Sequence, residues 1–230
     1  MAGRTIMVIE DDAAIREVLR LYLEKNGFSV IMQDRGDEAL SIVRAVQPAL
    51  IILDVVLPGQ NGFELCKEIR KITTVPVLFV SCKNTEQDKI TALAVGGDDY
   101  ITKPFSPNEL IARINANLRR PYYVSDDNEP TPKLAAGALQ VDLSGRTVKL
   151  NQTEIVLSKK EFELLAFLAS RPGKTFSHEE LFREIWGQES LNDTRTIIVH
   201  VSNLRKKIEP DPANPQHIIN VHGVGYKFIM

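Results

Sequence analysis

Two absences narrow the possible classes of protein: the sequence has almost no cysteine and no long apolar run. Its two cysteines, Cys66 and Cys82, are too few for a disulfide framework and are not spaced like metal ligands. No stretch approaches the roughly 20 apolar residues that a membrane span requires, and the first residues lack the apolar core of a signal peptide. We therefore expect a cytoplasmic protein without membrane insertion.

A strong excess of one charge is also lacking, since the formal net charge is −2. Such a balance normally disfavours binding to nucleic acid, although an average over the chain can hide a local basic cluster. The hydrophobic content of 43% is enough for a core, and 230 residues give room for one large domain or two ordinary ones.

The first half of the sequence alternates short apolar segments with helical patterns. The expected strands are residues 6–9, 30–32, 50–53, 77–80 and 100–102. The expected helices are residues 13–26, 37–46, 62–71, 85–95 and 106–119. Strands that alternate with helices of this length predict βαβ units, and therefore an α/β fold with a doubly wound parallel sheet.

The pattern changes at residues 121–133, where three prolines and an acidic cluster predict a linker. After it, residues 138–143 and 147–157 alternate like the strands of a small antiparallel sheet, and residues 218–229 resemble a β-hairpin. Three helical patterns lie between these segments, at residues 159–170, 178–186 and 194–208. We therefore predict two domains, 1–120 and 134–230, of which the second is α+β.

Polar residues follow four of the predicted strands in the first half. These are, in chain order, Glu10, Asp11, Asp54, Ser81 and Lys103. In a doubly wound sheet the carboxyl ends of the strands share one edge, so these side chains should lie close together. Three carboxylates at one place require a compensating charge, and Mg²⁺ suits such a set of oxygen ligands. Lys103 and the Ser81 hydroxyl could each bind an oxygen of a phosphoryl group carried by Asp54.

Each of these residues also has an ordinary explanation. An acid after a strand is more often a helix cap, and we expect Asp12 to be one, whereas a Lys-Pro pair is commonly a turn. An aspartyl-phosphate phosphatase of the haloacid dehalogenase type would need a second aspartate two residues after the nucleophile, where this sequence has Val56. The combination of residues at four strand ends therefore predicts a phosphoacceptor site and not the active site of an enzyme.

The segments VIEDD, LDVVLPGQNG, VSCKN and GGDDYITKPFSPNEL resemble the receiver domain of two-component response regulators, and the likeness covers residues 4–120. It implies a flavodoxin-like strand order, 2-1-3-4-5, and transfer of phosphate from a sensor histidine kinase to Asp54. The resemblance also implies a Mg²⁺ site whose ligands are Glu10, Asp11, Asp54 and the carbonyl of Val56. It further implies that Ser81 and Tyr100 form a switch pair and that the Lys103–Pro104 peptide bond is cis. Cys82 departs from the family, which usually has alanine or glycine there.

The helical pattern at residues 194–208 is the candidate for a DNA-reading element. Its apolar residues form a core stripe of Ile197, Val201, Leu204 and Ile208. The opposite side carries Arg195, Val199, Ser202, Asn203 and Lys206, and residues 195–208 contain four basic residues and no acid. A solvated amphipathic helix is the simpler explanation. An outward valine, however, suits a thymine methyl group, and serine and asparagine can bond to base edges.

The segment RTIIVHVSNLRKKIE, followed by INVHGVGYKF, resembles the winged-helix effector domain of the OmpR/PhoB family over about residues 134–230. The likeness implies that helix 194–208 reads promoter DNA, that the hairpin is a wing, and that RNA polymerase is a partner. The residues expected at the DNA are Arg195, Thr196, Val199, Ser202, Asn203, Lys206 and His222. Arginine is common in the family at three of these positions, Ser202, Asn203 and His222, so no target sequence can be carried over.

Charges of both signs occur within residues 85–119, as a self-complementary twofold interface requires. The candidates are Lys89, Asp98, Asp99, Glu109 and Arg113. The resemblance implies Lys89–Glu109 and Asp99–Arg113 bridges between the subunits of a homodimer that forms on phosphorylation. The alternative is that these are surface charges of little individual worth. The sequence thus predicts a phosphorylation-activated regulator of transcription, with a winged-helix regulator that does not depend on phosphate as the alternative.

Overall fold

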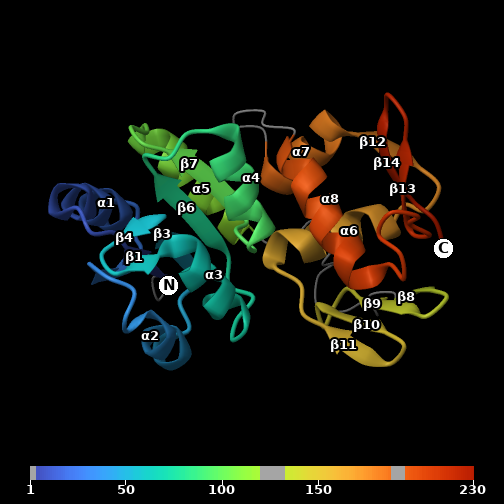
Figure 1. The fold of residues 1–230 in the computed structure, drawn as a ribbon, viewed down its shortest axis with the longest axis horizontal. Coiled ribbons are helices and arrows are strands. Elements are labelled where there is room, and N and C mark those ends of the chain that lie inside the picture. Colours follow the sequence, from blue (N-terminus) through green and yellow to red (C-terminus); the bar gives the residue numbers. More distant parts are fainter. Residues whose placement is uncertain (1–3, 120–132, 188–194) are drawn as a thin grey trace. The chain divides into compact units, whose positions relative to one another are not determined.

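The computed structural model describes residues 4–119, 133–187 and 195–230. The chain divides into two compact units, Met1–Leu118 and Arg119–Met230, which are called unit 1 and unit 2 below (Figure 1). Residues 121–132 of the expected linker lie outside the described residues, and residue 133 already begins a strand. None of the helices in the described part of the chain is long and apolar enough to cross a membrane.

Unit 1 contains a five-stranded sheet whose strands run parallel to one another. Its strands are β1 (Thr5–Ile9), β2 (Ser29–Gln33), β3 (Leu50–Leu53), β6 (Val77–Ser81) and β7 (Asp99–Thr102). Their spatial order is β2-β1-β3-β6-β7, which confirms the predicted order 2-1-3-4-5. A short hairpin of β4 (Val56–Leu57) and β5 (Gln60–Asn61) follows β3, and the sequence did not predict it.

Helices cover both faces of this sheet (Figure 1). They are α1 (Ala13–Lys25), α2 (Ala39–Val46), α3 (Gly62–Arg70), α4 (Glu86–Ala94) and α5 (Pro107–Leu118). Side chains of α2, α3 and α4 share a hydrophobic cluster with Met7 and Ile51, whereas those of α1 and α5 share another with Ile6 and Ile52. Successive strand residues thus face opposite sides of the sheet, and the doubly wound α/β fold is confirmed.

Two glycines after β3 leave Asp54 at the carboxyl edge of the sheet. Gly59 has a φ of 73° between β4 and β5, a backbone region that glycine adopts without steric cost. At Gly62 a side chain would overlap the carbonyl oxygen of Asp54, because α3 begins directly against the end of β3. The sequence PGQNG therefore allows the chain to turn back closely behind the acid.

Unit 2 begins with a four-stranded antiparallel sheet of order β11-β10-β9-β8. Its strands are β8 (Lys133–Ala136), β9 (Leu139–Asp142), β10 (Thr147–Leu150) and β11 (Thr153–Ile155). The helices that follow are α6 (Lys159–Ala169), α7 (His178–Trp186) and α8 (Arg195–Ile208). The predicted hairpin, β13 (Ile218–Val221) and β14 (Gly225–Phe228), forms a second sheet with the short strand β12 (Thr175–Ser177).

The core of unit 2 contains residues from both sheets and from α6, α7 and α8. The stripe predicted on α8 is buried in it, namely Ile197, Val201, Leu204 and Ile208. In α7, Phe182 stacks on Trp186 with ring centroids 5.5 Å apart. Two helices that share a core with a terminal hairpin form a winged helix-turn-helix, so the predicted α+β fold is confirmed. The sequence did not predict β8 or β12.

Candidate functional site

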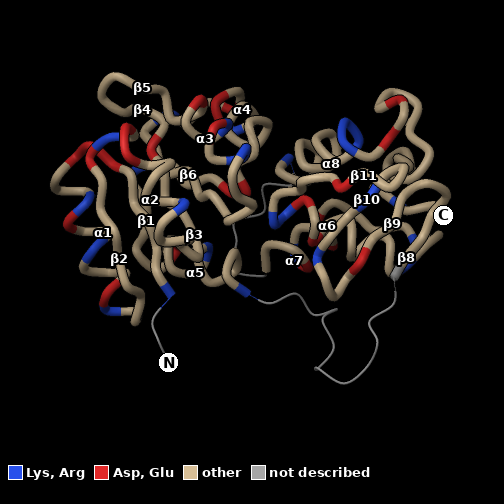
Figure 2. Tube along the Cα trace, turned by 90° about the horizontal axis from the view of Figure 1, so that it is seen from below, with Lys and Arg blue, Asp and Glu red and all other residues tan. Residues whose placement is uncertain are grey.

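The acidic site of unit 1 lies where β1 and β3 end. These strands are neighbours, with Ile9 opposite Leu53, so the residues that follow them meet at one edge of the sheet. One carboxylate oxygen from each of Glu10, Asp11 and Asp54 lies within 4.8 Å of the others. Glu10 is 1% exposed and Asp54 5% exposed, whereas Asp11 is exposed to solvent. Figure 2 shows acidic positions in red where the chain passes from β1 into α1.

Lys103 holds the two buried carboxylates of this site together. Its Nζ lies 2.6 Å from Oε2 of Glu10 and 2.6 Å from Oδ2 of Asp54. Burial alone would lower the pKa of Lys103, but its hydrogen bonds to Asp54 and Glu10 raise that pKa overall. Burial raises the pKa of Glu10 from 4.5 to about 7, although its bond from Lys103 opposes the effect. Burial of Glu10 therefore outweighs the compensation that Lys103 gives to its charged form.

The expected switch residues are both buried but differ in their hydrogen bonds. Ser81 ends β6 and is fully buried, and its Oγ has no hydrogen-bond partner within the described part of the chain. The Tyr100 hydroxyl donates to the carbonyl oxygen of Lys83 at 2.6 Å. Burial raises the pKa of Tyr100 to about 12, so the phenol is neutral at physiological pH. A buried hydroxyl without a partner is rare in proteins and often marks a place where an absent group would bind.

The remaining residues of the predicted receiver site lie around Asp54 or at the ends of neighbouring strands and helices. The backbone N–H of Val56 donates to Oδ1 of Asp54 at 3.1 Å, and the Lys103–Pro104 peptide is cis, as expected. Asp12 caps α1 by accepting the N–H of Ile15 at 2.9 Å, which confirms that this acid is structural. Cys82 is exposed. The three carboxylates thus form a set of oxygen ligands that fits Mg²⁺. The lysine and the unpaired buried hydroxyl are hydrogen-bond donors that fit a phosphoryl group.

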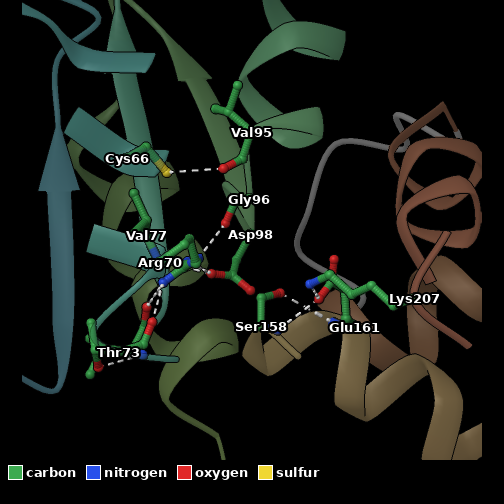
Figure 3. Close-up of polar contacts among 11 residues, drawn as sticks. Cys66, Arg70, Thr73, Val77, Val95, Gly96, Asp98, Ser158, Glu161 and Lys207 are labelled. Atoms are coloured by element: carbon green, nitrogen blue, oxygen red, sulfur yellow. Dashed lines mark hydrogen bonds and ion pairs between the residues drawn. The ribbon is translucent and has the colours of Figure 1, made fainter. Parts of the chain in front are cut away.

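The charged residues of 85–119 make their ion pairs within the chain. Arg113 is buried and its Nη1 lies 2.8 Å from Oδ1 of Asp99, while its Nε lies 3.1 Å from Oε1 of Glu109. Asp98 is fully buried and accepts from Arg70 at 2.6 Å (Figure 3). The expected intersubunit Asp99–Arg113 bridge is therefore an internal pair in this structure, because β7 and α5 are close enough for a buried arginine to be neutralised locally.

On α8 the exposed face differs from the predicted one. Arg195, Ser202 and Lys206 are exposed as predicted, but Thr196, Val199 and Asn203 are buried and Ile198 is 47% exposed. The exposed positions 195, 198, 202 and 206 follow helical spacing, and each of the three buried residues comes one position after an exposed one. Of the residues predicted to contact DNA, Arg195, Ser202 and Lys206 are thus exposed in this structure and Thr196, Val199 and Asn203 are buried, while DNA contact by any of them stays a prediction. His222, between β13 and β14, is exposed.

Half of the basic residues expected on α8 bind the rest of unit 2. Nε and Nη2 of Arg205 donate to the carbonyl oxygen of Ile218, at 3.0 and 2.6 Å. Nζ of Lys207 lies 2.6 Å from Oε2 of the buried Glu161 (Figure 3). Arg195, Lys206 and Lys207 are exposed, but Glu161 offsets the charge of Lys207, so the positive surface is smaller than the charge count predicts.

The hydrogen bonds of three side chains, Glu209, Arg205 and Arg16, were not predicted from the sequence. Glu209, buried at the end of α8, accepts the N–H groups of Gln216, His217 and Ile218 at 2.8, 2.9 and 2.9 Å. Together with Arg205 it joins α8 to the hairpin. Arg16 of α1 donates to the backbone of the acidic loop. No sequence signal identifies such contacts, because they depend on where a long side chain points and not on the period of its element.

Comparisons with known proteins follow the same division into two units. Residues 6–115 match the model of the response regulator receiver domain, and residues 152–228 match that of the C-terminal domain of transcriptional regulatory proteins. DNA-binding response regulator MtrA of Mycobacterium tuberculosis is 40% identical over 222 residues, covering 96% of this chain and 95% of that protein. The chain belongs to the DNA-binding response regulators. A receiver joined to a DNA-binding domain makes it a phosphorylation-dependent regulator of transcription.

Other relatives of this response regulator agree with the assignment. Sensory transduction protein RegX3 of Mycolicibacterium smegmatis is 39% identical over 223 residues, covering 97% of this chain and 98% of that protein. Response regulator DrrB, an OmpR/PhoB homolog from Thermotoga maritima, matches with a TM-score of 0.51 and 31% identity, covering 99% and 100% of the two chains. A mutant of RitR matches with a TM-score of 0.76 and 26% identity, covering 98% and 99%. Members of this family are typically transcription factors and not enzymes.

Proposed function

We propose that Asp54 accepts the phosphoryl group that controls this response regulator, and that a sensor histidine kinase supplies it. The observation that carries the proposal is the position of Asp54, buried at the sheet edge with Oδ2 2.6 Å from Nζ of Lys103 and close to Glu10 and Asp11. We further propose that Glu10, Asp11, Asp54 and the carbonyl of Val56 hold Mg²⁺. When bound, Mg²⁺ would neutralise phosphoryl oxygens and carboxylates together.

The side chains at this site support a proposed role for each of them in the transfer. An Asp54 oxygen attacks phosphorus, so an O–P bond forms while the N–P bond of a phosphohistidine breaks and the imidazole leaves with the electron pair. Lys103 then donates to one phosphoryl oxygen, and the unpaired Ser81 hydroxyl donates to another. The product adds roughly −1.5 to −2 charges at a site that is already acidic. Movement of Ser81 and Tyr100 towards the new group is the proposed switch.

For the effector domain we propose that α8 reads promoter DNA and that the β13–β14 hairpin is its wing. The exposed side chains Arg195, Ser202, Lys206 and His222 support this proposal, and Ile198 replaces Val199 as the exposed apolar contact for a thymine methyl group. Thr196, Val199 and Asn203 are buried in this structure and can contact DNA only in a conformation that exposes them. We also propose RNA polymerase as a partner and the cytoplasm as the location, because a regulator that binds a sensor kinase and promoter DNA has to work where both are accessible.

We propose that phosphorylation also produces a homodimer through residues 85–119. Its charged members are Lys89, Asp98, Asp99, Glu109 and Arg113. Because Arg113 binds Asp99 and Glu109 within the chain, and Arg70 binds Asp98, the intersubunit bridges would form by exchange of existing partners. Exchange between ion pairs of similar strength is close to energetically neutral, which suits an equilibrium that one phosphoryl group can shift.

The assignment of Asp54 is tested by chemical phosphorylation. Incubation of the full chain with acetyl phosphate and Mg²⁺ should add one phosphoryl group that is stable in acid and labile in base, measured by intact mass. Asp54→Asn should abolish the addition, whereas Asp12→Asn, which changes the neighbouring helix cap, should retain it. Full labelling of Asp54→Asn would show that another residue is the acceptor.

A further inference from the structure

Arg16 reaches from α1 back to the loop that carries the acids. Its Nη1 donates to the carbonyl oxygen of Glu10 at 2.7 Å and to that of Asp11 at 2.7 Å. The first carbonyl belongs to the peptide group before the Asp11 Cα, and the second belongs to the peptide group after it. Because each peptide group is planar, one guanidinium nitrogen fixes the orientation of both groups that flank Asp11.

Asp11 depends on this backbone support more than its two neighbours do. The carboxylates of Glu10 and Asp54 are each fixed by Lys103, and Asp54 also accepts from the N–H of Val56. The Asp11 carboxylate is exposed and makes no side-chain hydrogen bond to the described residues. The two flanking peptide groups therefore set the direction of its Cα–Cβ bond, from which the carboxylate extends.

We propose that Arg16 is a positioning residue of the acidic site, which directs the Asp11 carboxylate towards Glu10 and Asp54 by holding the peptide groups on both sides of it. The inference rests on the proposed Mg²⁺ site, to which it adds a residue outside the ligand set. A ligand that is already oriented loses less conformational freedom when a cation binds, and supports of this kind commonly change metal affinity by about 10-fold or more.

A purely electrostatic role for Arg16 predicts the opposite effect. A guanidinium near three carboxylates repels a divalent cation, so removal of its charge alone would strengthen Mg²⁺ binding. Removal of a positioning contact would instead weaken binding, because the loop around Asp11 would have to be ordered by the metal. The sign of the change in Mg²⁺ affinity therefore distinguishes the two roles.

The test is calorimetric titration of Mg²⁺ into the full chain, with thermal unfolding measured in parallel. Arg16→Ala should raise the Kd for Mg²⁺ by about 10-fold, and Arg16→Lys should raise it less, since lysine keeps the charge but lacks the rigid fork of arginine. Arg20→Ala is the matched control, because Arg20 lies on the same helix, is exposed and pairs with Glu17 at 2.6 Å. It should bind Mg²⁺ like the wild type.

Each outcome has a separate meaning. If the wild type and Arg20→Ala bind Mg²⁺ but Arg16→Ala binds equally well or more tightly, the positioning role is wrong, whatever its melting temperature. If the wild type does not bind Mg²⁺, the proposed metal site itself fails. Should Arg16→Ala be unfolded, the decision passes to Arg16→Lys, for which an unchanged Kd also contradicts the proposal.

Discussion

The two cysteines show how strongly a local environment sets the chemistry of a single residue. Cys66 is buried in α3, where its Sγ donates to the carbonyl oxygen of Val95 at 3.8 Å (Figure 3). Burial raises the pKa of the Cys66 thiol from 9.0 to about 12. Cys82 is exposed directly after Ser81, beside the proposed phosphoryl site. The thiolate is the reactive form of cysteine, so the two residues should differ sharply towards electrophiles.

Alkylation of the native chain should therefore stop at one equivalent. With iodoacetamide at pH 8, which lies well below a pKa of about 12, Cys66 stays protonated and shielded while Cys82 reacts. Intact mass should show one adduct for the wild type and for Cys66→Ser, none for Cys82→Ser, and two for the wild type in denaturant. An adduct on native Cys82→Ser would mean that α3 opens readily around Cys66.

At the residue scale, the sequence predicted positions more reliably than contacts. Glu10, Asp54 and Lys103 could be placed at one edge because the rule for parallel sheets needs only the strand ends. The ion pairs of Lys103 join residues 93 and 49 positions apart, and which acids it would bind could not be read from spacing. Arg16 gave no signal, because a basic residue in a first helical turn has many ordinary uses.

At the scale of elements, α8 and the wing are joined by two side chains. Arg205 donates to the carbonyl of Ile218, and Glu209 accepts the N–H of the same residue and of Gln216 and His217. Both backbone groups of Ile218, at the start of β13, are thus bound by the end of α8. This arrangement fixes the wing relative to the proposed reading helix, which determines the distance between major-groove and wing contacts on DNA.

Glu209→Ala should therefore destabilise unit 2 markedly. Removal of the carboxylate leaves three N–H groups without their acceptor, among them that of the buried Ile218, which should reduce the free energy of unfolding by about 2–3 kcal/mol. The chain has a single tryptophan, Trp186, which lies in the core of this unit, so its fluorescence during urea denaturation reports unit 2. Glu154→Ala, on the exposed β11, should change stability by less than about 0.5 kcal/mol. Equal effects of the two substitutions would contradict the role of Glu209.

The elements that sequence reasoning missed are short and paired over long distances. β12 has three residues and pairs with β14 some fifty positions later, for example Phe176 with Tyr226, so its strand character comes from its partner. β8 begins at the end of the expected linker, where proline and acidic residues conceal it. Long amphipathic helices were predicted well because burial of one face decides them. The same reasoning located the core stripe of α8, but it could not predict that Val199 and Asn203, away from this stripe, are buried as well.

At the scale of the whole molecule, the proposed mechanism has to convert one phosphoryl group into a change of DNA affinity. Asp99 and Glu109, two acids of the proposed dimer face, both form ion pairs with Arg113 of the same chain. In the unphosphorylated chain these acids therefore gain little from pairing with a second chain. A dimer places two reading helices on half-sites about one helical turn apart. The gain comes from linkage, since the second half-site is then bound at a high effective concentration.

This mechanism predicts that phosphorylation acts on paired half-sites only. With a target selected from random DNA fragments, acetyl phosphate should increase the affinity for two half-sites by about 100-fold or more, while the affinity for an isolated half-site changes little. Fluorescence anisotropy with both DNAs gives the two gains directly. Asp54→Asn should bind both DNAs like the unphosphorylated wild type.

A variant of the dimer face separates dimerisation from phosphorylation. Lys89 is half-buried on α4, and unlike Arg113 it can be reversed in charge without breaking a buried ion pair. Lys89→Glu should accept the phosphoryl group normally but remain monomeric in sedimentation, because glutamate would face Glu109 of the second subunit, and it should lose the gain on paired half-sites. If phosphorylated Lys89→Glu keeps that gain, or if the wild type gains equally on a single half-site, phosphate increases the DNA affinity of a single chain and does not act by joining two chains.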